Sequence, residues 1–250
     1  MAKNKPRVAV FDFACCEGCQ LQIVNLEEEL LDLLGVADVV EWREAMSEKS
    51  HEYDIALVEG SITRKEDEER LNIIRSRTKI LVAIGACATT GGVNKLKNNF
   101  QMDDVKKYVY GKDADKPHLD TYPTKAVDEV VKVDYKVHGC PMDRGEFTYV
   151  LRSLLLGKKP EIPEYPVCVE CKAKGNQCLW EKGQVCLGPI IRAGCGARCP
   201  SAGFRCFGCR GYIDNPNINA AKDVMEKYDL TVEDLKSKMV LFGSTREPTL

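Results

Sequence analysis

The positions of the cysteines constrain the fold of this chain more than any other feature. Thirteen cysteines occur among 250 residues, and the five that precede residue 157 follow segments that resemble strands or end one. Cys15, Cys16 and Cys19 follow "RVAVFDF", Cys87 ends "KILVAIGAC", and Cys140 follows "VDYKVHG". In a parallel α/β sheet the carboxyl ends of the strands lie at one edge, where ligands bind. The pattern therefore predicts that three separated loops bring thiols to one edge of one sheet.

The first 157 residues alternate between strand-like and helix-like segments. We expect strands at 7–13, 37–42, 53–60, 79–87 and 130–137, and helices at 21–35, 65–77 and 146–157. Gly35 is expected to end the first helix, because glycine often follows the last helical residue. Strands that alternate with helices of this length indicate a parallel sheet with right-handed crossovers. The fold class predicted for residues 1–157 is therefore α/β.

A proline-rich stretch predicts a domain boundary. "GKKPEIPEYP" at 157–166 has three prolines in ten residues and no apolar periodicity. Beyond it, residues 168–209 contain eight cysteines with many glycines and little periodicity. We expect residues 158–250 to form a small, irregular domain with short helices at 219–228 and 231–242, the second N-capped by Thr231.

Composition excludes several classes of partner. The net charge of −2 gives no basic surface for nucleic acid or for an anionic membrane. The apolar runs are shorter than the ~18 residues that a membrane span requires. The N-terminal "MAKNKPRVAVFDF" has neither the apolar core of a signal peptide nor a twin-arginine pair. These features predict a cytoplasmic protein with no nucleic-acid and no membrane partner.

A reducing compartment excludes a disulfide framework for so many cysteines, so metal binding is the expected use of the thiols. The second domain has the spacing Cys168-x2-Cys171-x6-Cys178-x7-Cys186-x8-Cys195-x3-Cys199-x6-Cys206-x2-Cys209. Two sets of four thiolates suit either tetrahedral zinc or a [4Fe-4S] cluster. Cysteines that interrupt the interval between the C-x2-C pairs, and the many glycines and backbone amides, favour the cluster. Zinc remains the alternative.

The sequence contains no recognisable catalytic constellation. The histidines are His51, His118 and His138, and they form neither a Ser-His-Asp nor an H-E-x-x-H pattern. His51 and His118 lie in polar stretches and are expected at the surface. His138 either donates a hydrogen bond to a cluster sulfur or is an incidental loop residue. We therefore expect no catalytic residue in this chain.

Short motifs in both domains carry a family resemblance. They are "CEGCQ" at 16–20, "VEGSI" at 58–62, "GACATTGG" at 85–92, "HGCP" at 138–141, "CLGP" at 186–189 and "CFGC" at 206–209. In this order they resemble the small subunits of [NiFe]-hydrogenases. The chain is most similar to the small (delta, electron-transfer) subunits of cytoplasmic multimeric hydrogenases, of the sulfhydrogenase and F420-non-reducing type. This resemblance implies a flavodoxin-like parallel-sheet N-terminal domain followed by an iron–sulfur domain.

The resemblance also implies three [4Fe-4S] clusters as cofactors. Their implied ligands are Cys16, Cys19, Cys87 and Cys140 for the proximal cluster, Cys195, Cys199, Cys206 and Cys209 for the medial cluster, and Cys168, Cys171, Cys178 and Cys186 for the distal cluster. Cys168 stands where periplasmic members have a histidine, and Cys199 stands where they often have a proline. A fourth thiolate at each place implies low-potential [4Fe-4S] clusters.

The same resemblance implies a division of labour among subunits. A partner large subunit would split hydrogen at its nickel–iron site, and this chain would carry the electrons as a hydrogenase (oxidoreductase) subunit. Flavin- or iron–sulfur-containing subunits linked to NAD(P), ferredoxin or a disulfide reductase are the implied further partners. Glu17 and Glu59 would lie near the subunit interface. The alternative for Glu17 is a solvated acid in a loop, and the alternative for Glu59 is a role in positioning the cluster. Cys15 is expected to be a buried non-ligand on the last residue of the first strand.

Two other functions remain open on the sequence alone. The quinone-side iron–sulfur subunit of complex I shares the first domain and uses a tandem cysteine pair, which Cys15-Cys16 resembles. However, that subunit lacks a second domain with eight cysteines. A zinc-stabilised scaffold without a redox role is the alternative from another class.

Overall fold

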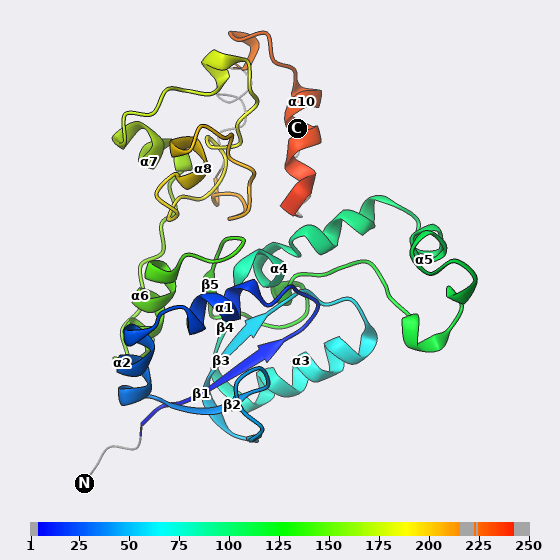
Figure 1. Cartoon of the computed structure of the whole chain (residues 1–250), viewed down its shortest axis with the longest axis vertical. Coiled ribbons are helices and arrows are strands. Elements are labelled where there is room, and N and C mark those ends of the chain that lie inside the picture. The colour runs from blue at the N-terminus through cyan, green and yellow to red at the C-terminus, as the bar shows by residue number, and fades with distance from the viewer. Residues whose placement is uncertain (1–4, 216–222, 224, 243–250) are drawn as a thin grey trace. The chain divides into compact units, whose positions relative to one another are not determined.

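A computed structural model of the chain describes residues 5–215, 223 and 225–242. The chain divides into two compact units, residues 1–160 and 161–250, which are described separately. The first unit contains a five-stranded parallel sheet with strand order β2-β1-β3-β4-β5 (Figure 1). The strands are β1 (Arg7–Asp12), β2 (Asp38–Trp42), β3 (Tyr53–Glu59), β4 (Thr78–Ile84) and β5 (Tyr135–Val137). The predicted α/β fold with a parallel sheet is confirmed.

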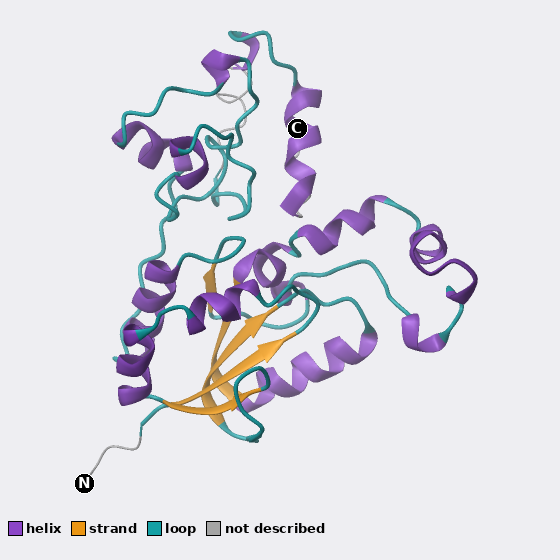
Figure 2. Ribbon diagram, viewed as in Figure 1, coloured by secondary structure: helices purple, strands orange, loops and turns teal. Residues whose placement is uncertain are grey.

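Six α-helices of the first unit connect or extend these strands (Figure 2), among the residues that the structure describes. They are α1 (Gly18–Val24), α2 (Glu28–Val36), α3 (Lys65–Arg77), α4 (Gly85–Thr90), α5 (Met102–Tyr110) and α6 (Arg144–Leu155). Helix α3 has the predicted bounds, with acidic residues in its first turn and arginines in its last. This charge distribution stabilises the helix by complementing its dipole.

Both faces of the sheet are buried. In β1, Ala9 and Phe11 point to one face, Val8 and Val10 point to the other, and all four are at most 4% exposed. Leu71 of α3 packs into the same hydrophobic cluster as Ala9 and Phe11. Burial on two faces is typical of parallel sheets, and it explains why β1, β3 and β4 read as continuous apolar runs.

The helix predicted at 21–35 is wrong in one respect, because two helices occupy this segment. Helix α1 ends at Val24 and α2 begins at Glu28, and Glu27 between them has a positive φ of 54°. Leu26 and Leu33 are both buried, so the apolar spacing continues across the interruption and conceals it. Gly35 lies inside α2 and does not end it.

The segment around Cys87 also differs from its prediction. The strand expected at 79–87 ends at Ile84, and Cys87 lies in the short helix α4 that follows directly. The strand expected at 130–137 is confined to β5. Between α4 and β5 the chain forms α5 and four 3₁₀ segments that sequence analysis did not assign: η1 (Val93–Asn99), η2 (Gly111–Asp113), η3 (Pro117–Leu119) and η4 (Val127–Glu129).

The second unit is irregular and has short helices, as predicted. They are α7 (Val167–Ala173), α8 (Arg198–Ser201), α10 (Val232–Met239), η5 (Trp180–Lys182) and η6 (Val240–Phe242). Its core contains Trp180, Leu187 and Ile191 together with several cysteines. Thr231 caps α10 as expected, since its hydroxyl accepts a hydrogen bond from the Asp234 amide at 3.1 Å. Most of the helix expected at 219–228 lies outside the described residues.

Candidate metal centres

The first candidate centre lies where four loops leave the carboxyl ends of β1, β3, β4 and β5. Backbone hydrogen bonds join these loops to one another. The Phe13 amide donates to the Glu59 carbonyl at 2.9 Å, and Ala14 and Ser61 form an antiparallel bridge. The Ala86 amide in α4 donates to the Gly139 carbonyl, which precedes Cys140, at 2.7 Å. The segments that carry the cysteines are therefore fixed relative to one another.

The thiols of three of these loops lie close enough to influence one another. Burial raises the pKa of the Cys87 thiol to about 12, and the neighbouring Cys140 and Cys16 thiols raise it further. Burial also raises the pKa of Cys140, and the neighbouring Cys16 thiol raises it further. Cys19 is buried, and its raised pKa is due to burial first, then to Glu59 and Cys87. Cys15, Cys16, Cys19 and Cys140 therefore all lie near Cys87, and these effects do not separate Cys15 from the four expected ligands.

Glycines allow the backbone to pass directly against these thiols. A Cβ on Gly85, which has φ +79°, would collide with Cys19 Sγ. A Cβ on Gly92 would lie 2.9 Å from Cys87 Sγ, closer than real Cβ contacts. Backbone without side chains beside the sulfurs is compatible with an iron–sulfur group at this place, because exposed amides near the sulfurs stabilise such a group.

Glu59 orients the segment that contains Cys19. Its carboxylate is 2% exposed and accepts hydrogen bonds from the amides of Cys19 at 3.0 Å and Gln20 at 3.1 Å. Both amides lie in the first turn of α1, which otherwise has no side-chain cap. Burial raises the pKa of Glu59, and the two amide hydrogen bonds oppose that increase. Sequence analysis left open whether Glu59 lies at an interface or positions a ligand, and these contacts show that it orients the backbone of Cys19.

A second ionic group holds the turn between Cys16 and Cys19. Glu17 has a left-handed backbone conformation, with φ 60°, which is unusual for a residue other than glycine. Arg43, which follows β2, forms ion pairs with Glu17 at 3.1 Å and with Asp12 at 2.8 Å. Glu17 is therefore an ion-paired residue of the turn, and sequence analysis did not identify Arg43 because it lies far away in the chain.

Cys15 and the three histidines are the other residues of this unit for which the sequence predicts a position. Cys15 was expected on the last residue of the first strand, but β1 ends at Asp12 and Cys15 follows it in the loop. Cys15 is half-buried rather than fully buried, and burial raises its pKa to about 12, with Glu59 and Cys87 adding to the increase. His51 and His118 are exposed as predicted, and His138 is 8% exposed in the loop after β5.

The second unit brings its cysteines together in a similar way. Helix α7 carries Cys168 and Cys171. Burial raises the pKa of Cys168 to about 12, and the neighbouring thiols of Cys186, Cys171 and Cys178 contribute smaller increases. A Cβ on Gly188 would lie 3.2 Å from Cys168 Sγ and 3.6 Å from Cys186 Sγ, so the backbone of this glycine packs closely against two thiols.

The remaining four cysteines lie in the segment 195–209. Burial raises the pKa of Cys199, and the neighbouring Cys195 thiol raises it further. Cys206 is buried, and burial raises its pKa far above the usual value, with Cys186, Cys209 and Cys195, in that order, as smaller causes. The Cys206 amide donates to Cys186 Sγ at 3.1 Å, which links the two groups of cysteines.

Glu170 of α7 connects the same two regions, and sequence analysis did not identify it. Its carboxylate accepts hydrogen bonds from the Gly194 amide at 2.8 Å and the Ala197 amide at 3.0 Å, on either side of Cys195. Across the described parts of the chain, no three histidine, cysteine, aspartate or glutamate side chains converge on a single-ion site. Within the same residues, no helix has the length and apolar character to cross a membrane.

Comparison with known proteins identifies relatives of the whole chain. Residues 16–154 match the family described as the 20 kDa subunit of NADH ubiquinone oxidoreductase. The delta subunit of sulfhydrogenase 2 from Pyrococcus furiosus is 37% identical over 95% of this chain and 99% of its own length. The G-type chain of the F420-non-reducing hydrogenase vhu from Methanocaldococcus jannaschii is 33% identical over 83% of this chain and 82% of its own.

Solved structures agree with these relatives. A chain of an NAD⁺-reducing [NiFe]-hydrogenase in the H2-reduced state has a TM-score of 0.59 and 29% identity, and the match covers 64% of this chain and 96% of that one. A chain of the [NiFeSe]-hydrogenase of Desulfomicrobium baculatum, at 18% identity, shows the same fold with a TM-score of 0.56 over 87% of this chain and 98% of that one. The chain is an oxidoreductase subunit that belongs to the 20 kDa NADH ubiquinone oxidoreductase subunit family and, within it, to the delta-type and G-type subunits of hydrogenases.

Proposed function

We propose that this chain relays electrons between the nickel–iron site of a partner large subunit and further redox subunits of the same hydrogenase. When bound, an iron–sulfur cluster supplies a site that accepts and releases one electron. In this proposal, residues 1–157 hold the proximal [4Fe-4S] cluster and residues 158–250 hold the medial and distal ones. The ligands are Cys16, Cys19, Cys87 and Cys140 (proximal), Cys195, Cys199, Cys206 and Cys209 (medial), and Cys168, Cys171, Cys178 and Cys186 (distal).

The observation that supports this proposal most strongly is the arrangement around Cys87. Its thiol is influenced by Cys16 and Cys140, which come from loops after two other strands. The backbone of Gly92 packs against the same residue, where any side chain would crowd the sulfur. Thiols that meet across loops beside bare backbone match what a four-thiolate cluster requires.

The residues of the chain would contribute ligation, orientation and exclusion of water. Burial keeps the unligated thiols protonated, so ligation would release protons as iron replaces them. Glu59 and Glu170 fix backbone segments next to Cys19 and Cys195, which orients these ligands before they bind. No residue of this chain is assigned to the splitting of hydrogen.

The proposed partners follow from this role. They are a [NiFe]-hydrogenase large subunit and flavin- or iron–sulfur-containing subunits linked to NAD(P), ferredoxin or a disulfide reductase. The cytoplasm is the proposed location, because a reducing compartment suits thirteen cysteines.

Metal analysis of the anaerobically purified chain in its complex tests the proposal. We expect a brown chain with a broad absorption band at the blue end of the visible spectrum, and four iron and four sulfide for each set of four cysteines. A colourless chain that contains zinc would establish the scaffold alternative instead. A high-potential [3Fe-4S] signal in a redox titration would contradict the all-[4Fe-4S] assignment.

Co-purification separates the two electron-transfer roles. Recovery with a large subunit that contains nickel and iron supports the hydrogenase role. Recovery with quinone-reducing complex I subunits, in the absence of nickel, would favour the quinone-side alternative.

A further inference from the structure

We infer that Asn94 is a positioning residue for the proximal ligands, because its amide holds the loop that carries Cys16 and Cys19. The inference rests on the proposed function, in which these two cysteines bind the proximal cluster. It concerns a residue that is not itself a ligand and that lies on a segment for which sequence analysis expected no element.

The Ala14 carbonyl, immediately before Cys15-Cys16, is the point of attachment. Asn94 Nδ2 donates to this oxygen at 2.7 Å and to Ser61 Oγ at 2.9 Å. Ser61 Oγ donates to the same carbonyl at 3.2 Å, and the Ser61 amide donates to it at 3.0 Å. Donors from two other loops therefore fix the start of the loop that carries Cys16 and Cys19. Glu59 fixes the end of the same loop at the Cys19 amide.

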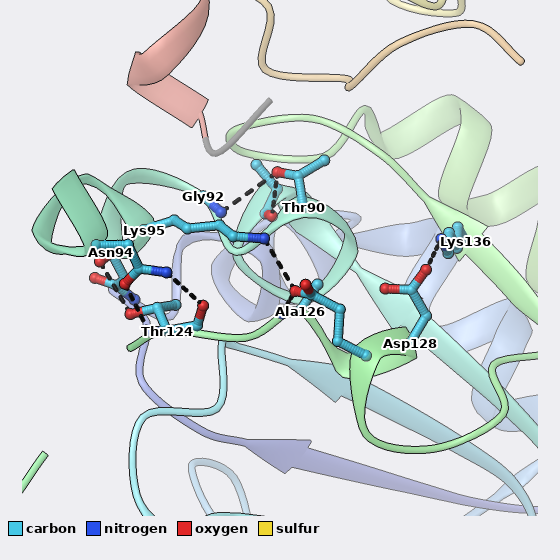
Figure 3. A network of polar contacts seen from close by, with 11 residues as sticks. Thr90, Gly92, Asn94, Lys95, Thr124, Ala126, Asp128 and Lys136 are labelled. Atoms are coloured by element: carbon cyan, nitrogen blue, oxygen red, sulfur yellow. Dashed lines mark hydrogen bonds and ion pairs between the residues drawn. The ribbon is translucent and has the colours of Figure 1, made fainter. Parts of the chain in front are cut away.

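Asn94 is itself held firmly by its neighbours. It lies in η1, and Thr124 Oγ1 donates to its carbonyl at 3.0 Å, as the close-up shows (Figure 3). Asn98 of the same 3₁₀ segment accepts from the Thr124 amide at 2.7 Å. Gly92, two residues before Asn94, lies against Cys87. Asn94 thus connects the loop of Cys16 and Cys19 to the segment that carries Cys87.

The chemistry of the contact makes the asparagine amide essential to it. Both acceptors of Nδ2 are oxygens, and Asp at this position would have the same shape but no donor. A carboxylate would then face the Ala14 carbonyl oxygen and repel it. The loss of one or two hydrogen bonds at a half-buried site shifts an equilibrium by about tenfold.

The test compares two isosteric variants in the anaerobically purified hydrogenase complex. Asn94→Asp removes the contact to Ala14, whereas Asn98→Asp is the matched control. Asn98 Nδ2 donates to the Thr124 carbonyl at 2.9 Å, so the control loses a similar hydrogen bond in the same segment without touching Ala14. The readouts are the rate of iron release to a chelator and the midpoint potential of each cluster, followed by electron paramagnetic resonance.

For Asn94→Asp, we expect one cluster's share of the iron to leave about tenfold faster and the midpoint potential of that cluster alone to shift. For Asn98→Asp, which keeps the acceptor for the Thr124 amide, we expect no change that is confined to one cluster. Wild-type values in Asn94→Asp, or the same change in both variants, would overturn the inference. If Asn94→Asp does not assemble, Ser61→Ala is the deciding variant, because it keeps the backbone bridge to Ala14. A smaller effect that is confined to the same cluster supports the inference. The absence of any effect overturns it.

Cys16→Ala distinguishes a failure of this inference from a failure of the proposed function. If Cys16→Ala loses one cluster and Asn94→Asp behaves like wild type, only the inference is wrong. If the wild-type chain contains no iron, or if Cys16→Ala keeps every cluster, the ligand assignment is wrong and the inference falls with it.

Discussion

Replacement of Glu59 by glutamine tests a buried polar contact of the proximal region. The Glu59 carboxylate accepts two amide hydrogen bonds, from Cys19 and Gln20, at a position that is 2% exposed. Glu59→Gln keeps one acceptor oxygen and turns an NH2 group towards the second amide, so one buried N–H loses its partner. A buried donor without a partner costs about 1–3 kcal/mol. Because burial already disfavours the carboxylate charge, we expect the lower half of that range, about 1–2 kcal/mol.

The assay is the rate of iron release to a chelator from the anaerobically purified complex, together with its thermal midpoint. A loss of about 1–2 kcal/mol corresponds to a roughly 5- to 30-fold change in a local opening equilibrium, and iron should leave the proximal cluster correspondingly faster. Glu68→Gln is the matched control, since Glu68 is partly exposed and pairs with Lys125 at the surface. Equal release from the wild type and Glu59→Gln would refute the positioning role of Glu59.

Three further results are expected. Gly85→Ala should prevent assembly of the proximal cluster, measured as lost iron, because the new methyl group collides with the Cys19 thiol and φ +79° costs alanine a further ~1–2 kcal/mol; a full complement of iron would contradict this. Cys16→Ala should lose one cluster by iron and sulfide analysis, whereas Cys15→Ala should keep all of them; the reverse outcome would mean that the tandem pair was assigned the wrong way round. Leu71→Ala, at a fully buried site, should destabilise the first unit by about 2–5 kcal/mol in denaturant unfolding, and a change below ~1 kcal/mol would show that the core collapses around the vacancy.

Local signals were sufficient for much of the fold. Helix α3 was predicted at its observed bounds because its charges are segregated towards the two ends. The buried strands were recognisable because a parallel sheet covered on both faces requires continuous apolar runs. In contrast, the break at Glu27 was not visible, since Leu26 and Leu33 are buried on either side of it and keep the helical spacing.

The candidate site was predictable to a similar extent. The spacing of the cysteines indicated which residues carry the chemistry, and the ends of β1, β4 and β5 indicated that their loops meet. The elements between α4 and β5 were not predicted, because η1 is a short 3₁₀ segment and α5 has no buried residue whose periodicity could reveal it. The role of Asn94, which lies in this segment, could therefore not be predicted from the sequence.

The sequence by itself determined the parallel α/β architecture and the family of the chain, because both depend on residue type and local spacing, and the same spacing predicts sets of four cysteines. Only the tertiary structure decided which groups hold the ligand loops. Glu59 lies 40 residues from Cys19, and Asn94 lies 80 residues from Ala14. No local periodicity encodes such pairs, since they form only when the sheet brings the loops together and burial makes an unpaired amide costly.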